Sequence, residues 1–244
     1  MPTSTAEASS RVQAVPVSRR ELGAWAFFDF ANSGYTTVVL TTIYSAYFVA
    51  VIAADMDARS PGSATLAWTL SIGAANLLVL LSGPVLGAIA DRRATKKRFL
   101  LFSSALCVVS TALLAFAGPD ETGLAITLLV ISAIAFALGE NLIAAFLPEI
   151  AHPDNMGRIS GYGWSLGYFG GLLTLGTCLA YISWAEAREL PATHYVPACL
   201  LITAVIFAAA AAPTFLWLRE RARPLAPVPG VSYLKAGFGQ VAHT

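Results

Sequence analysis

Two carboxylates inside long apolar stretches are the residues best placed to do chemistry. Asp29 is followed three positions later by Asn32, which puts both side chains on one face of a helix, and Glu140 is followed directly by Asn141. A charged group inside a bilayer costs at least a few kcal/mol, so such residues usually serve a function. We expect Asp29, Asn32, Glu140 and Asn141 to line one cavity at a similar depth. The alternative for each carboxylate is a structural hydrogen bond between helices.

Proton transfer is the chemistry that such carboxylates favour. In a cavity that holds little water, a carboxyl group can hold and release a proton. Proton coupling is therefore a hypothesis that rests on Asp29 and Glu140.

The other reactive residue types predict no second site. The three cysteines lie in different apolar stretches, without close spacing or a histidine neighbour, so we expect no disulfide framework, metal ion or cofactor. The apolar stretches contain no histidine and no serine paired with a base, so we expect no catalytic residue and no enzyme. The cysteines are Cys107, Cys178 and Cys199, and the histidines are His152, His194 and His243.

A charged segment follows the second apolar stretch and reads GAIADRRATKKR from Gly87 to Arg98. Its glycine permits close helix approach, Asp91 can accept hydrogen bonds from the loop, and the cations favour the cytoplasmic side. A loop that only fixes orientation would explain the five cations. It would not explain why Asp91 lies four residues after Gly87 and directly before Arg92.

A glycine stripe lies in the fifth apolar stretch. Gly163, Gly167 and Gly171 are spaced four residues apart, so they share one face of a helix. Small residues at this spacing let two membrane helices approach closely. We expect these glycines to serve helix packing.

The composition indicates that the surrounding solvent is a lipid bilayer. Of the 244 residues, 57% are hydrophobic and 12% are charged, whereas an ordinary soluble domain has about 25% charged residues. The mean hydropathy is +0.67. Six apolar stretches are each long enough to cross a bilayer, which takes about 20 residues, and none shows the alternation of barrel strands. We therefore predict an all-α membrane protein, a bundle of six transmembrane helices.

The predicted organisation has three parts. A disordered cytoplasmic tail covers residues 1–23, the transmembrane domain covers 24–218, and a cytoplasmic linker covers 219–244. The predicted spans are 25–54, 64–90, 99–117, 122–148, 159–184 and 195–218.

The basic residues predict the orientation. On the face that carries both termini lie 13 of the 15 lysine and arginine residues, so both termini are expected in the cytoplasm. The expected location is the inner or plasma membrane, with a multi-pass topology. Because the cations form no basic face, we do not expect nucleic acid as a partner.

Four sequence segments resemble a known family. The segment from Gly87 through Asp91 and Arg92 to Lys97 is similar to the signature loop of the major facilitator superfamily. The blocks WAFFDFANSGY (25–35), FLPE (146–149) and SGYGWSLGYFGG (160–171) resemble its Atg22-like (UMF1) branch. The chain departs from the signature at Ala94, where the family usually has glycine, and at Thr95, where it usually has a basic residue.

The resemblance implies a secondary transporter that moves a small-molecule solute by alternating access. The chain would be the N-terminal six-helix half of a twelve-span fold, with spans 1, 2, 4 and 5 lining the path. Gly87, Asp91 and Arg92 would form the gating loop. The eukaryotic relatives are linked to amino-acid efflux.

Two questions stay open from the sequence. The chain is either part of a longer transporter, which lacks here its C-terminal half, or a half-transporter that pairs with a second copy or another chain. The alternative to transport is a membrane module for assembly or sensing that uses the glycine stripe as its interface, or an inactive truncated transporter.

Overall fold

A computed structural model describes residues 17–119 and 121–221, and within these ranges all regular structure is helical. The elements in chain order are α1 (Arg19–Tyr35), η1 (Thr36–Thr41), α2 (Ile43–Tyr47), η2 (Phe48–Ile52), α3 (Ala54–Arg59), α4 (Ser63–Arg93), α5 (Lys96–Leu114), α6 (Thr122–Ala144), α7 (Leu147–Ile150), α8 (Met156–Glu186) and α9 (Ala192–Trp217).

Six helical stretches in the described residues are long and apolar enough to cross a membrane. This confirms the predicted fold class, an all-α bundle of six membrane helices. The stretches are Arg19–Ile52, Ser63–Ala90, Lys96–Leu114, Thr122–Ile150, Met156–Glu186 and Ala192–Trp217. Leucines such as Leu70 and Leu80 are exposed on α4, which agrees with a surface that faces lipid or another membrane helix.

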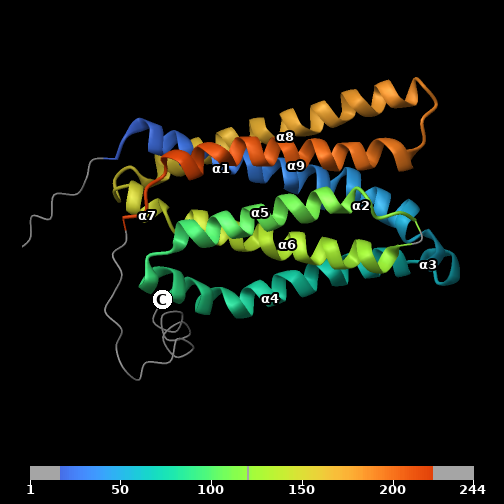
Figure 1. Cartoon of the computed structure of the whole chain (residues 1–244), viewed down its shortest axis with the longest axis horizontal. Helices are drawn as coiled ribbons and strands as arrows, with labels where there is room; N and C mark the ends of the chain where they lie inside the picture. Colours follow the sequence, from blue (N-terminus) through green and yellow to red (C-terminus); the bar gives the residue numbers. More distant parts are fainter. Residues whose placement is uncertain (1–16, 120, 222–244) are drawn as a thin grey trace, which may run out of the picture.

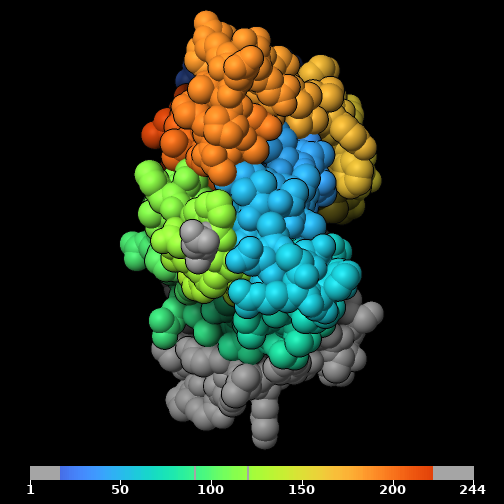
Figure 2. All heavy atoms as spheres, turned by 90° about the vertical axis from the view of Figure 1, so that its right-hand side faces the viewer, coloured from blue at the N-terminus to red at the C-terminus, as the bar shows by residue number. Residues whose placement is uncertain are grey.

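The first span lies in the middle of the bundle. Helix α1 packs between α8 and α9, and α5 packs on both α6 and α9. Helix α4 lies at the edge and packs mainly on α6 (Figure 1). Figure 2 shows the end of the bundle that carries α3, where the first span separates the hairpin of α8 and α9 from α4. We call the opposite end, where α1 begins and α9 ends, the basic end.

The first span starts earlier than predicted. Helix α1 begins at Arg19 because Ser18 and Glu21 form a capping box, in which each side chain bonds the backbone N–H of the other residue. The tail predicted over residues 1–23 is therefore wrong from Arg19 onward. Residues 1–16 and most of the predicted linker, 222–244, lie outside the described residues.

The first span is also irregular where the prediction had one continuous helix. Two π-helical segments, η1 and η2, interrupt it, and Thr42 between them has φ −120° and ψ −80°. The Thr37 carbonyl accepts from the backbone N–H of Thr42 at 3.1 Å and from the Thr41 hydroxyl at 3.0 Å. β-Branched threonine and valine dominate η1, and they fit a regular α-helix less well than unbranched residues. π-Helical turns often mark functional positions.

Candidate functional site

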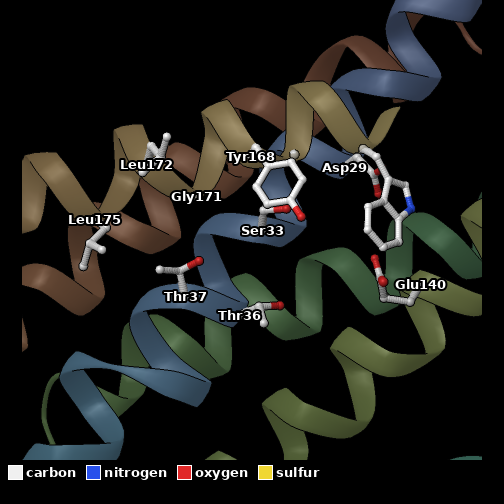
Figure 3. A pocket seen from close by; sticks show the side chains of 11 residues that line it. Asp29, Ser33, Thr36, Thr37, Glu140, Tyr168, Gly171, Leu172 and Leu175 are labelled. Atoms are coloured by element: carbon white, nitrogen blue, oxygen red, sulfur yellow. The ribbon is translucent and has the colours of Figure 1, made fainter. Parts of the chain in front are cut away.

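A cavity of about 390 Å³ opens among α1, η1, α6 and α8, and we call it the central pocket. Figure 3 shows Asp29 and Glu140 at one end of it and Leu172 and Leu175 at the other. Its described lining holds two carboxylates, three serine or threonine hydroxyls, a tryptophan and a tyrosine, but no lysine, arginine or histidine. The lining residues are Asp29, Ser33, Thr36, Thr37, Glu140, Trp164, Gly167, Tyr168, Gly171, Leu172 and Leu175.

The two carboxylates lie at a similar depth. Asp29 is ten residues from the start of the first span at Arg19, and Glu140 is ten residues from the end of the fourth span at Ile150. Ten helical residues correspond to about 15 Å, so the two carboxylates lie at a similar distance from the basic end. The sequence prediction placed both in one cavity, and the structure brings them together.

The surroundings of the two carboxylates differ. The Glu140 Oε1 atom accepts a hydrogen bond from the Asn32 side-chain amide, which joins α6 to α1. No described residue donates a hydrogen bond to the Asp29 carboxylate, which lies against the backbone of Gly163 on α8. A Cβ atom added to Gly163 would be 2.9 Å from Asp29 Oδ2.

Two further hydrogen bonds fix the rotation of α1 against α6. The indole Nε1 of Trp25 donates to the Ile143 carbonyl at 2.9 Å, and the hydroxyls of Tyr35 and Ser132 are 2.8 Å apart. Interhelical hydrogen bonds of this kind contribute about 0.6–2 kcal/mol each in a membrane. Together with the bond between Asn32 and Glu140, they hold Glu140 at the edge of the pocket.

Glycines let α8 approach α1 on the other side of the pocket. A Cβ atom added to Gly167 would be 2.8 Å from Ser33 Oγ, and one added to Gly171 would be 3.0 Å from Thr37 Oγ1. The glycine stripe therefore lies against a helix of the same chain. The alternative in which this stripe is an interface for assembly is wrong, because α1 already covers it.

Two of the four predicted cavity residues do not line the central pocket. Asn32 is only 4% exposed, and it lies behind Glu140 as its hydrogen-bond donor. Asn141 lines a different, mostly apolar cavity between α4, α5 and α6. Adjacent helical residues point about 100° apart, and here Glu140 and Asn141 face different cavities.

Helix α4 does not line the central pocket, contrary to the path predicted for spans 1, 2, 4 and 5. It contributes Gly83, Leu86, Gly87 and Ala90 to the second cavity instead. The predicted gating loop is also mostly helical, because α4 continues through Asp91 and Arg92 to Arg93. Only the turn at Ala94 and Thr95 separates it from α5.

The turn between α4 and α5 contains Ala94, where the chain departs from the family signature. Ala94 has a φ of 49°, a left-handed conformation that glycine adopts without steric cost. Alanine stands at the signature position that usually holds glycine, so it carries a Cβ where the backbone disfavours one.

Three carboxylates at the basic end were missed by the sequence prediction. Glu149 binds Lys96 Nζ and the backbone N–H of Arg221, both at 2.9 Å. Glu21 binds the Arg221 guanidinium at 2.8 Å and accepts from the Arg219 backbone N–H.

Glu220 caps the start of α5, where its carboxylate accepts from the backbone N–H groups of Lys96 and Lys97. The segment after α9 is thereby tied to α1, α5 and α7. In the sequence these carboxylates lie at the ends of apolar spans, and this position could have indicated that they bind neighbouring helix ends.

The hydroxyls of the pocket were also missed. Ser33, Thr36 and Thr37 follow Asp29 at helical spacing, and this run of hydroxyl residues in an apolar span could have indicated them. The aromatic residues Trp164 and Tyr168 gave no such signal, because exposed aromatic residues are common on membrane helices. Among the described residues, no group of three or more His, Cys, Asp or Glu side chains could hold a metal ion.

The fold and the site together define a multi-pass membrane protein with a polar pocket between its helices, an arrangement that solute transporters use. Residues 2–175 match the family model described as Major Facilitator Superfamily, and residues 154–244 match the one described as vacuole effluxer Atg22 like. The chain belongs to the Major Facilitator Superfamily, which confirms the family predicted from the sequence. The second match supports the Atg22-like branch.

A curated relative from Bacillus subtilis (strain 168) is named as an uncharacterized MFS-type transporter, YxiO. It is 31% identical to this chain over 172 residues, which is 70% of this chain and 40% of the relative. The chain thus matches about two fifths of the length of that relative. No solved structure matches the chain.

Proposed function

We propose that the chain is the N-terminal six-helix half of a secondary active transporter, and that the central pocket is part of its solute path. One observation carries the proposal: two carboxylates from different membrane spans, Asp29 and Glu140, line one cavity without a described basic side chain. Such groups are costly in a membrane and usually mark a transport or proton pathway. The role is transport and not catalysis.

We propose that protons drive this transport through Glu140 and Asp29. Two carboxylates in one pocket repel each other when both are charged, and a proton on either one removes that repulsion. Glu140 is the better candidate for coupling, because it both faces the pocket and bonds Asn32 on α1. Protonation at Glu140 would change the contact between α1 and α6, and so would link the proton to helix movement.

The chemistry of the pocket fits a small amine-bearing solute such as an amino acid. Its carboxylates can bind an ammonium group, and the hydroxyls of Ser33, Thr36 and Thr37 can bind a carboxylate. Support for efflux as the direction comes from the Atg22-like match, whose description is that of a vacuole effluxer.

The pocket is open at α8, where its lining residues Trp164, Tyr168 and Leu172 are exposed. We propose that a second six-helix unit completes it, either a C-terminal half or a second copy of the chain. Transporters of this kind bind solute between two such units near the middle of the membrane. Light scattering in detergent separates the two cases, since a self-paired chain has twice the mass of 25.6 kDa.

We propose that the basic end faces the cytoplasm and that the protein resides in the inner or plasma membrane. The positive-inside rule supports this orientation, because 13 of the 15 lysine and arginine residues belong to that side. Gly87, Asp91 and Arg92 then lie at the cytoplasmic end of α4, and we propose that they gate the path there against the second unit.

The proposal is tested with the complete transporter in liposomes that contain a pH-sensitive dye. Amino acids are added one at a time, and solute-dependent proton movement is recorded. In Glu140→Gln we expect gradient-driven solute flux to be lost, while exchange of labelled for unlabelled solute continues at equal pH. Glu186→Gln, at an exposed carboxylate on the end of α8, serves as the control and retains both activities. Parental gradient-driven flux in Glu140→Gln would refute the coupling role.

A further inference from the structure

Two free cysteines face each other between α8 and α9, away from the central pocket. Cys178 and Cys199 are both fully buried. The Cys178 thiol contacts the Cys199 carbonyl at 3.7 Å, and the Cys199 thiol contacts the Cys178 carbonyl at 3.8 Å.

The geometry of the hairpin explains this reciprocal contact. Helix α8 ends at Glu186 and α9 begins at Ala192, so a short loop makes the two helices antiparallel neighbours. Cys178 is eight residues before the end of α8, and Cys199 is seven residues after the start of α9. At 1.5 Å per residue both lie about 11 Å from the loop, and so at the same level.

The surroundings isolate the two thiols from water. Val38 is buried with them, and partly buried Tyr181 and Ile202 pack around the pair. The nearby Thr203 hydroxyl donates to the Cys199 carbonyl at 2.8 Å. A water-soluble oxidant therefore has no direct access to these sulfurs.

We propose that Cys178 and Cys199 form an oxidisable dithiol that closes into an interhelical disulfide. In this reaction the two S–H bonds break and one S–S bond forms. The two electrons and two protons reduce a lipid-soluble quinone to its hydroquinone. The disulfide would join α9 to α8, the helix that supplies six of the described pocket-lining residues.

The burial of the pair predicts selectivity for the oxidant. Thiol–disulfide exchange requires a thiolate and access to the sulfur, and an apolar site disfavours both for a water-soluble reagent. A lipophilic two-electron oxidant should therefore oxidise the pair, whereas glutathione disulfide should not. Cys107 is equally buried on α5, and it serves as an internal control.

The test uses the full chain in detergent micelles, treated with tetramethylbenzoquinone or with glutathione disulfide. The chain is then denatured in excess iodoacetamide, which alkylates the free thiols as they become exposed, and cut with trypsin, and the peptides are weighed without reduction. Cleavage after Arg188 separates the two cysteines, so a disulfide is seen as peptides 159–188 and 189–219 joined, 2 Da below their summed mass.

We expect the quinone to produce this joined peptide alone, and reduction to separate it. Cys107→Ser should keep the product, and Cys178→Ser should lose it. A chain that is oxidised after denaturation should instead form all three pairings of its cysteines. The proposal is overturned if the folded wild-type chain keeps three alkylated thiols after treatment with both quinone and copper phenanthroline, or if Cys107 is paired as often as Cys178.

Discussion

Substitution of Gly170 by alanine should separate α1 from α8 at the back of the central pocket. A Cβ atom added to Gly170 would collide with the carbonyl oxygen of Phe30 and would lie 2.7 Å from its Cα. Backbone atoms cannot rotate away as a side chain does, so the two helices must move apart by about 1 Å to restore an ordinary contact. Gly176 lies on the same helix with nothing within 4 Å, and Gly176→Ala is the matched control.

The expected magnitude combines two effects. Alanine in place of glycine favours a helix by about 1 kcal/mol, and this effect acts at both positions. Overpacking costs about 1–3 kcal/mol and acts only at Gly170. The free energy of unfolding of Gly170→Ala should therefore fall about 1 kcal/mol below that of the wild type, and about 2 kcal/mol below that of Gly176→Ala.

The assay uses the three native cysteines, all of which are buried. A maleimide dye that fluoresces on reaction with thiols reports unfolding as a denaturing detergent is titrated into the micelles. If Gly170→Ala is as stable as Gly176→Ala, the close approach of α8 to Phe30 is not a packing constraint and this reasoning is refuted.

Three further substitutions test other parts of the fold with the same dye assay. Ala94→Gly should stabilise the protein by about 0.5–1 kcal/mol, because glycine removes the strain at φ 49°; a destabilised variant would contradict the left-handed turn. Thr214→Val should destabilise it by about 1 kcal/mol, since the buried hydroxyl donates to the Ala24 carbonyl at 2.7 Å; an unchanged stability would mean that this bond contributes nothing. Glu149→Gln should cost about 1–2 kcal/mol, because its ion pair with Lys96 is mostly shielded from water, and a loss that disappears in high salt would show a solvent-exposed pair.

Much of the fold was predictable because the bilayer restricts the choices. A span needs about 20 apolar residues with its backbone bonded internally, so hydropathy alone gave six helices. Counting residues from the span ends also placed Asp29 and Glu140 at one depth. Depth along a helix follows directly from sequence position.

The rotation of each helix and the partners of its ends were not predictable in the same way. Asn141 was placed beside Glu140 in the pocket, yet it faces the second cavity because neighbouring residues point in different directions. The break at Thr42 depends on hydrogen bonds that compete locally with the regular helix. The pair of Glu21 with Arg221 joins residues 200 positions apart, and no local pattern indicates such a contact.

The most direct test of the account is whether water reaches the central pocket from outside the lipid. In a variant of the complete transporter whose native cysteines are replaced, Thr36→Cys in the pocket is compared with Val109→Cys, which is 54% exposed on the apolar surface of α5. Permeabilised membranes are treated with a small charged methanethiosulfonate reagent, which reacts only with thiols in water. We predict rapid labelling at Thr36→Cys and none at Val109→Cys. Equal resistance of both positions would contradict a solute path between α1, α6 and α8.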